Sequence, residues 1–209
     1  METADYIAEQ RLLGGHPALD FVNSGDGEGG PEYVECLRTY EDLVAWAHRA
    51  GIVTEAAGDG LIAEASRRPA EADQVLRRAL RIRDDLDRLF RAIATRGSPP
   101  RAAVRHLGDA HAEALAHAKL IQDGGRFTWS WSEGRDLREV LWRVVHTATE
   151  LATSEALGRV KVCAGCRWLF CDASKNHSRR WCAMEDGCGS EAKMKKYVAR
   201  RAARKTKTR

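Results

Sequence analysis

Hydrophobic side chains recur every three or four residues through most of the chain before residue 158, a period typical of amphipathic helices packed on a core. The longest such run, 69–96, has charges on its other face, and a second run begins after the Gly- and Pro-containing break at 97–100. Thr39 and Gly51 bracket another run as N-cap and helix end. The pattern predicts helices over 39–51, 54–67, 69–96, 104–118 and 135–157.

Three segments depart from the helical period. An apolar run over 12–24 leads into a stretch dense in Gly at 24–31, and residues 126–131 alternate aromatic with polar side chains. We expect one or two strands over 12–24, a loop over 24–31 and a half-buried strand over 126–131. Residues 1–158 are therefore predicted to form a mainly α domain with a few short strands, an α+β fold.

Beyond Gly158 the composition changes to Cys, Trp and basic residues, so we place a domain boundary between 1–158 and 159–209. V-K-V-C at 160–163 reads as a strand that pairs with R-W-L-F-C-D, and a helix is expected after Cys188. The second domain is thus predicted to be a small module of a β-hairpin plus helices. Its aromatic residues are expected to form a core, with stacking on nucleic-acid bases as the alternative: Trp168, Phe170 and Trp181.

The composition indicates a soluble protein. Of 209 residues, 44% are hydrophobic and 31% charged, and no stretch approaches the roughly 18 uninterrupted apolar residues of a membrane span. The N-terminal residues lack a basic segment followed by an apolar run, so we expect a cytoplasmic protein without a secretory signal and without a membrane partner. In a reducing compartment, clustered cysteines are more often metal ligands than disulfides.

Five of the six cysteines lie between 163 and 188, and Cys36 is expected to be a buried apolar residue. C-A-G-C at 163–166 and C-A-M-E-D-G-C at 182–188 form two pairs spaced as in zinc-binding modules. Four thiolates satisfy the tetrahedral preference of zinc and leave no open position, which indicates one structural Zn²⁺. The predicted ligands are Cys163, Cys166, Cys182 and Cys188.

Two other residues compete for the fourth ligand position. Cys171 follows an apolar segment and is expected to pack inside the module, whereas His177 lies in the loop before Cys182 and would replace Cys188 if the second knuckle were wider. The four-cysteine set is favoured over both.

The net charge of +4 conceals an asymmetry between the two parts of the chain. Residues 159–209 hold fifteen Lys or Arg against four Asp or Glu, a net charge of +11, and the preceding residues hold nineteen against twenty-six, a net charge of −7. After Cys188, Ser190 is a candidate N-cap of a helix with one basic face. That face carries Lys193, Lys196, Arg200 and Arg204. Such a stripe suits a phosphate backbone or a major groove, while Met194, Tyr197 and Val198 are expected to pack on the module.

Several segments resemble one known family. They are C-A-G-C-R-W-L-F (163–170), S-K-N-H-S-R-R-W-C (174–182) and C-G (188–189) before a basic helix, together with G-G-H-P-A-L-D-F-V-N (14–23) and L-R-T-Y-E-D-L-V-A-W (37–46). As a set they are similar to the CGNR zinc-finger proteins, in which the finger follows a domain called ABATE. The resemblance covers nearly the whole chain and implies a bacterial stress-responsive transcription regulator whose finger binds DNA.

The chain departs from the family motif directly after its last cysteine. Where the family has Cys-Gly-Asn-Arg, this chain has Cys188, Gly189, Ser190 and Glu191. An acidic residue at the head of the basic helix repels phosphate, so either the contact moves to Arg179, Arg180 and Lys193 or DNA binding is weakened. Zinc binding is expected to be unaffected.

Three classes of function are weighed against these features. No catalytic motif appears in a convincing context, so we expect no enzyme activity. The leading hypothesis is a regulator whose zinc module binds duplex DNA and whose acidic body senses a small-molecule effector or forms a homodimer; the sequence does not identify ligand-binding residues. The alternative is a zinc-stabilised adaptor that binds RNA or an acidic protein without recognising an operator.

Overall fold

The mainly helical fold with a few short strands is confirmed by the computed structural model, in which 57% of the chain is helical. The structure describes residue 7 and residues 10–26, 34–185 and 187–207, with side chains in the last helix described up to residue 199. The helices are α2 (Pro17–Val22), α3 (Tyr40–Arg49), α4 (Glu55–Arg67), α5 (Pro69–Ala94), α6 (Arg101–Ala116), α7 (Glu139–Thr153) and α8 (Cys188–Lys207), with a 3₁₀ turn at Glu155–Arg159. None of the described helices is long and apolar enough to span a membrane.

Among the described residues, six short strands form three separate antiparallel pairs. They are β1 (Gly25–Asp26) with β2 (Val34–Glu35), β3 (Lys119–Asp123) with β4 (Arg126–Ser130), and β5 (Val160–Val162) with β6 (Leu169–Cys171). The pairing of the strand at 160–162 with the one that precedes Asp172 agrees with the hairpin expected from the sequence. Each pair is too small to hold itself together, so its position depends on the helices around it.

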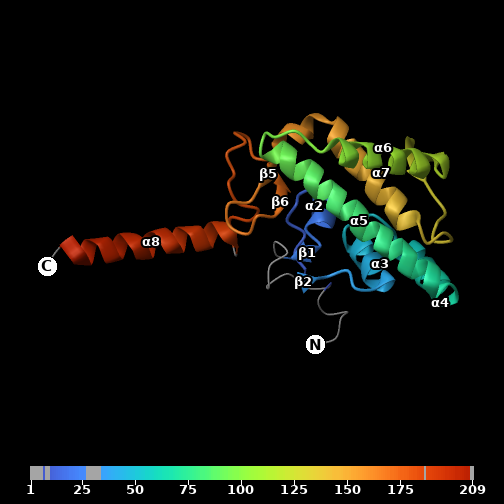
Figure 1. Cartoon of the computed structure of the whole chain (residues 1–209), viewed down its shortest axis with the longest axis horizontal. Coiled ribbons are helices and arrows are strands. Elements are labelled where there is room, and N and C mark those ends of the chain that lie inside the picture. Colours follow the sequence, from blue (N-terminus) through green and yellow to red (C-terminus); the bar gives the residue numbers. More distant parts are fainter. Residues whose placement is uncertain (1–6, 8–9, 27–33, 186, 208–209) are drawn as a thin grey trace.

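The long helix α5 crosses the body and contacts α2, α3, α4 and α6, while α7 packs against both α6 and α2 (Figure 1). Every helix expected from the hydrophobic period is present. Thr39 caps α3 through a capping box with Asp42, and Pro69 occupies the first turn of α5, where its missing N–H costs nothing. The core of the body is one continuous cluster of buried side chains from α2 to α7.

The strands predicted over 12–24 are wrong, because residues 17–22 form the helix α2. Pro17 lies in its first turn, and the His16 side chain accepts a hydrogen bond from the Ala18 amide at 3.3 Å. Residues 18–22 are all buried. A short apolar run that is buried on all sides has the same pattern in a strand and in a helix, so periodicity does not separate the two.

The strand predicted over 126–131 exists as β4, but it is exposed and not half-buried. The buried aromatic residue is Trp131, just after the strand, whose Nε1 donates to the Ala114 carbonyl at 2.9 Å. The partner strand β3 was not predicted. Its residues lack the alternation of a half-buried strand because both of its faces are exposed.

The β5–β6 hairpin packs directly on the helical body (Figure 1). Val160 and Leu169 belong to the same buried cluster as the helices. The Asn23 side chain completes the contact: its Oδ1 accepts from the Leu169 amide at 3.0 Å, and its Nδ2 donates to the Leu169 carbonyl at 2.8 Å. The Gly14 carbonyl accepts from the Cys171 amide at 2.7 Å. The segment after α7 therefore folds onto the body as an extension of its core.

We expect Asn23→Ala to lower the free energy of unfolding by about 2–4 kcal/mol, because it leaves both buried backbone groups of Leu169 unpaired. Urea denaturation of the zinc-loaded chain measures the change. Asn176→Ala, at an exposed asparagine of the second domain, is the matched control and should change stability by less than about 0.5 kcal/mol. Equal effects of the two substitutions would contradict the proposed anchoring.

Candidate metal centre

The first cysteine pair lies in a tight turn directly after β5. The Cys163 amide donates to the Trp168 carbonyl at 2.8 Å, and the Arg167 amide donates to the Cys163 carbonyl at 3.1 Å. Arg167 closes the turn with a positive φ of 64°. These bonds turn the chain back between β5 and β6 and place Cys163 and Cys166 at the same end of the hairpin.

The second pair joins the loop after β6 to the last helix. Cys182 is buried, and Cys188 is the first residue of α8. The Gly189 amide donates to the Ala183 carbonyl at 2.9 Å and closes the loop between the two cysteines. The direction of α8 is therefore fixed at a residue that supplies one of the four sulfurs.

The four predicted ligands converge. The Sγ atoms of Cys163, Cys166, Cys182 and Cys188 all lie within 4.8 Å of one another, and those of Cys166 and Cys182 are 3.5 Å apart. A tetrahedral zinc ion with Zn–S bonds of about 2.3 Å needs sulfur–sulfur separations of roughly 3.8 Å. The donor set and its spacing fit one Zn²⁺ with all four positions occupied by protein, which makes the site structural.

The surroundings of Cys163 favour its thiolate form. Burial alone would raise the pKa of this thiol, but backbone N–H groups that include those of Cys182 and Gly165, each 3.4 Å from Sγ, lower its pKa to about 7. Burial raises the pKa of Cys188 to about 12, and the hydrogen bond to Cys182 raises that of Cys166. Four sulfurs at this spacing ionise together only when a cation compensates their charge.

Two glycines allow the turn that holds the first cysteine pair to lie close to the loop that holds the second pair. A Cβ atom at Gly165 would lie 2.9 Å from the Cys188 sulfur, and one at Gly189 would lie 2.8 Å from the Met184 Cα atom. A side chain at Gly165 would therefore collide with the ligand Cys188, and one at Gly189 would collide with the backbone of the loop that leads to Cys188. The Gly that follows the last cysteine thus has a steric explanation.

The two rival ligands lie outside this group. Cys171 packs against the core of the body, with its sulfur 4.0 Å from the Ala156 carbonyl. His177 is exposed, and among the described residues the metal-ligating cluster contains neither of them. The preference for Cys188 as fourth ligand agrees with the geometry.

The aromatic residues between the pairs have unequal roles. Phe170 is fully buried in a small cluster with Cys163 and Cys182, and Trp181 packs at its edge. Leu13, from the start of the chain, completes the cluster. Trp168 is half-buried outside it. The core role expected from the sequence fits Phe170 and Trp181, and the body supplies part of this core.

Asp172 organises the loop that leads to Cys182. Its carboxylate accepts from Lys161 Nζ at 2.7 Å, from the Ser174 hydroxyl at 2.6 Å and from the Arg179 amide at 3.0 Å. Burial would raise the pKa of this carboxyl, but these donors hold it well below its usual value. Sequence reasoning did not single out Asp172, although the spacing Asp-x-Ser is typical of a turn closed by a side chain.

The predicted nucleic-acid residues fall into three groups. Arg179 is half-buried, with its guanidinium 5.1 Å from the centre of the Phe170 ring and donating to the Cys182 carbonyl. Arg180, Lys193 and Lys196 are exposed. The side chains of Arg200 and Arg204 lie outside the described residues. These positions are compatible with a phosphate contact by the exposed group and with a supporting role for Arg179.

The last helix differs from expectation in two respects. It begins at Cys188, so Ser190 is not its N-cap; the Ser190 hydroxyl donates instead to the Gly187 carbonyl at 2.8 Å. Met194, Tyr197 and Val198 do not pack on the module but are 62%, 60% and 58% exposed. The reason is that α8 projects away from the body over most of its length (Figure 1).

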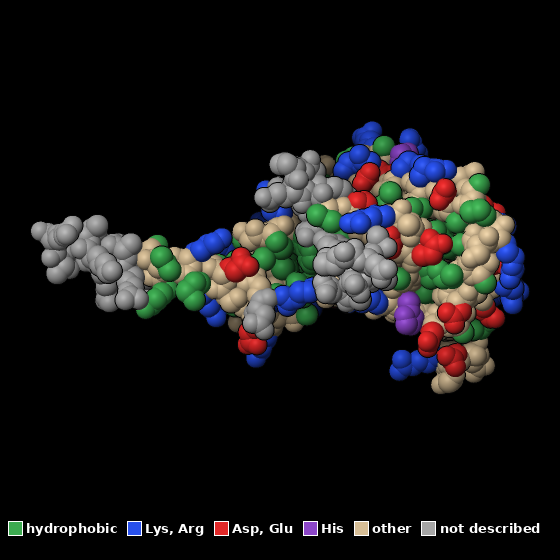
Figure 2. Space-filling model, turned by 90° about the horizontal axis from the view of Figure 1, so that it is seen from below, with side chains coloured by type: hydrophobic (Ala, Val, Ile, Leu, Met, Phe, Trp, Pro, Cys, Tyr) green, Lys and Arg blue, Asp and Glu red, His purple; other side chains and the backbone are tan. Residues whose placement is uncertain are grey.

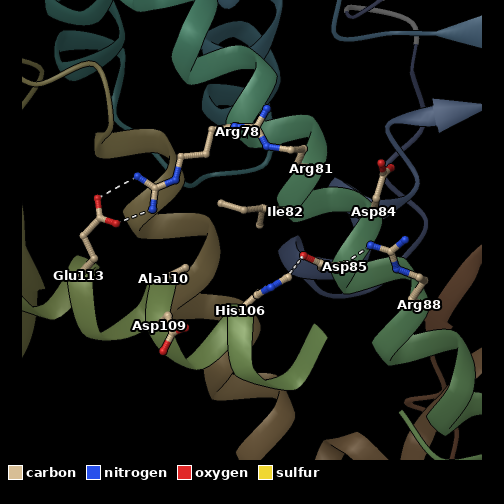
Figure 3. Close-up of a pocket in the computed structure, with 10 residues that line it drawn as sticks. All are labelled: Arg78, Arg81, Ile82, Asp84, Asp85, Arg88, His106, Asp109, Ala110 and Glu113. Carbon is tan, nitrogen blue, oxygen red and sulfur yellow. Dashed lines mark hydrogen bonds and ion pairs between the residues drawn. The ribbon is translucent and has the colours of Figure 1, made fainter. Parts of the chain in front are cut away.

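Outside the metal centre, an open groove of about 450 Å³ lies between α5 and α6. Arg78 and Glu113 meet across it with Nη1 and Oε1 2.9 Å apart, and Asp85 Oδ2 lies 2.9 Å from His106 Nδ1 (Figure 3). The Arg78–Glu113 ion pair and the Asp85–His106 hydrogen bond join the two helices, so we assign the groove a structural role. An effector site in the body stays a prediction.

A helical body joined to a four-cysteine module with a hairpin and a basic helix defines the chain as a zinc-finger protein. Comparison with protein families agrees: residues 159–201 match the CGNR zinc finger, and residues 15–155 match ABATE, described as "Putative stress-induced transcription regulator". The chain belongs to the ABATE family and carries a CGNR zinc finger. A search among curated proteins finds no relative that matches it.

We expect the purified chain to hold one zinc ion per molecule, as measured by elemental analysis. Cys188→Ser should release most of it, since loss of one thiolate breaks the closed tetrahedral set.

Cys171→Ser and His177→Ala are the matched controls and should keep the full zinc content, because neither side chain reaches the cluster. Loss of zinc from either control, or retention in Cys188→Ser, would contradict the assignment.

Asp172→Asn tests the anchor of the loop. The substitution removes the negative charge to which Lys161 Nζ and the Arg179 amide donate. We therefore expect the free energy of unfolding at neutral pH to fall by about 2 kcal/mol. Urea denaturation measures it, with Asp109→Asn on the exposed face of α6 as control. Unchanged stability in Asp172→Asn would show that the anchor is dispensable.

Proposed function

We propose that the chain is a transcriptional regulator whose zinc finger binds duplex DNA through α8 while the helical body senses an effector or dimerises. The observation that carries this proposal is the position of α8. It begins at the metal ligand Cys188 and projects from the body (Figure 2), and Lys193 and Lys196 on it are exposed. The regulatory description of the ABATE family supports the same assignment.

The dimensions of α8 suit a DNA groove. Twenty helical residues extend about 30 Å, and a helix with its side chains is about 10–12 Å across, close to the width of the major groove of B-DNA at about 12 Å. The net charge of +11 over 159–209 supplies the phosphate attraction that dominates affinity for DNA.

In this proposal the two arginines of the loop have different roles, one structural and one in contact with phosphate. Arg179 braces the loop against Phe170 and the Cys182 carbonyl, whereas Arg180 is exposed, with its guanidinium 5.5 Å from the centre of the Trp181 ring, and is proposed to contact phosphate. Glu191 lies in the first turn of the helix, where its charge opposes that contact. Binding is therefore proposed to rest on Arg180 and on the lysines further along the helix.

A second candidate is favoured by the apolar side chains of α8. Met194, Tyr197 and Val198 are spaced to share one face and are exposed, which suits the groove of an acidic protein or stacking on single-stranded RNA. Competition between duplex DNA and single-stranded RNA for the zinc-loaded chain separates the candidates. Preferential displacement by RNA would favour the adaptor.

For the leading proposal we expect DNA affinity to fall steeply with salt. Replacing Lys193 and Lys196 together by Gln should weaken binding at least about tenfold at low salt and reduce the slope of log affinity against log salt by about 2. Fluorescence anisotropy with a labelled duplex pool measures both quantities.

Arg77→Gln, at an exposed position on α5, is the control and should leave affinity and slope unchanged. Glu191→Arg, which introduces the residue of the family motif, should strengthen binding several-fold and steepen the salt dependence by about 1. Binding that is absent or insensitive to salt in the zinc-loaded chain would count against the proposal.

A further inference from the structure

The β3–β4 ribbon lies at the surface of the body, where Trp129 contacts the ring of His146 in α7 edge-on, with the ring centroids 6.3 Å apart. Within the described part of the chain these two strands pair only with each other, and both are exposed along almost their whole length. Trp131, just after β4, anchors the base of the ribbon in the core. A two-stranded ribbon exposed on both faces is at best marginally stable by itself, so this element is suited to gain strands from a partner.

One face of the ribbon is apolar. The register places Leu120 opposite Trp129 and Gln122 opposite Phe127, so these side chains share a face. Leu120, Phe127 and Trp129 are 56%, 70% and 39% exposed. Three large apolar side chains on one exposed face indicate an interaction surface and not a solvated loop.

The turn between β3 and β4 determines which backbone groups of β3 are not bonded to β4. Gly124 and Gly125 have φ values of 51° and 82°, as in a two-residue type I′ turn, so Asp123 and Arg126 form the hydrogen-bonded pair that closes it. Because hydrogen-bonded pairs alternate along an antiparallel ladder, the backbone groups of Leu120 and Gln122 point away from β4. The outer edge of β3 therefore offers donors and acceptors to another strand.

The sequence of β3 is complementary to itself. When two copies of Lys119–Asp123 run antiparallel about Ile121, each Lys119 lies opposite Asp123 of the second copy. Leu120 and Gln122 then form the hydrogen-bonded pairs that the free edge requires. The same operation on β4 would place Arg126 opposite Ser130 and gain no ion pair.

We propose that β3 pairs with β3 of a second copy of this chain about a two-fold axis at Ile121, which makes a four-stranded sheet in a homodimer. The apolar side chains of both ribbons lie on one side of this sheet, because residues directly opposite each other point to the same face. An edge strand that presents free backbone groups is blunted in most proteins, and here the two-fold pairing covers it. The proposal is independent of DNA binding and of zinc.

The test is the oligomeric state of the full zinc-loaded chain, measured by sedimentation velocity over a range up to about 100 μM. We expect a concentration-dependent dimer. Lys119→Glu should weaken it about tenfold, because it turns two attractive cross-strand pairs into two repulsive ones. Gln122→Pro should abolish it, because it removes an outward amide that the ribbon itself does not use.

The double substitution Lys119→Asp with Asp123→Lys is the decisive variant. It restores opposite charges across the two-fold axis, so it should recover the dimer lost in Lys119→Glu. Lys175→Glu, at an exposed position in the loop after β6, is the control and should dimerise as the original chain does. Circular dichroism and zinc content establish that each variant is folded.

A chain that stays monomeric over the whole concentration range overturns the proposal. So does a dimer that neither Lys119→Glu nor Gln122→Pro weakens, since that dimer uses another surface. A dimer weakened by the single charge reversal but not restored by the double substitution overturns the register about Ile121.

Discussion

Convergence of four thiolates on one cation is the constraint on which the second domain depends. The buried cluster of this domain is small, with Phe170, Cys163 and Cys182 at its centre, and such a core cannot stabilise a fold of this size. A bound ion crosslinks the turn after β5, the loop before Cys182 and the start of α8. Since α8 extends from the body with its apolar side chains exposed, the ligand at its first residue determines where it points.

The body imposes the second constraint. The segment 14–23 forms a clasp around the β5–β6 hairpin. Within it, the Gly14 amide donates to Asp20 Oδ1 at 2.7 Å. The Gly14 carbonyl accepts a hydrogen bond from the Cys171 amide, and the Asn23 side chain bonds both the amide and the carbonyl of Leu169. A Cβ atom at Gly14 would lie 2.9 Å from the Asp20 amide, so the clasp requires glycine there. Leu169 is one residue from Phe170, so this strand, together with Leu13 and the bond from Arg91 to the Arg167 carbonyl, positions the metal centre against the body.

The sequence predicted the features that depend on the period of hydrophobic residues and on the spacing of cysteines. The helices, the hairpin around 160–171 and the four metal ligands follow from local patterns, and the structure agrees with each of them. The strands expected over 12–24 were wrong because a fully buried segment has no polar face to reveal its period. The docking role of Asn23 depends on Leu169, 146 residues away in the chain, and no local pattern encodes such a contact. The partners of Asp172 lie 2 to 11 residues away, but its burial depends on how the hairpin and the loop fold together.

The proposed dimer through the β3–β4 ribbon would also fix how two copies of α8 are placed. A two-fold dimer through β3 would carry two copies of α8, and each helix would project from its own metal centre in a direction fixed by Cys188. Two recognition helices related by a two-fold axis select two half-sites at a spacing set by the protein. If α8 contacts phosphate as proposed, Glu191 in its first turn opposes that contact, so one finger alone would bind weakly and two would bind as a unit. Under both proposals, the departure of this chain from the Cys-Gly-Asn-Arg motif would shift part of the affinity for DNA from the single finger to the dimer.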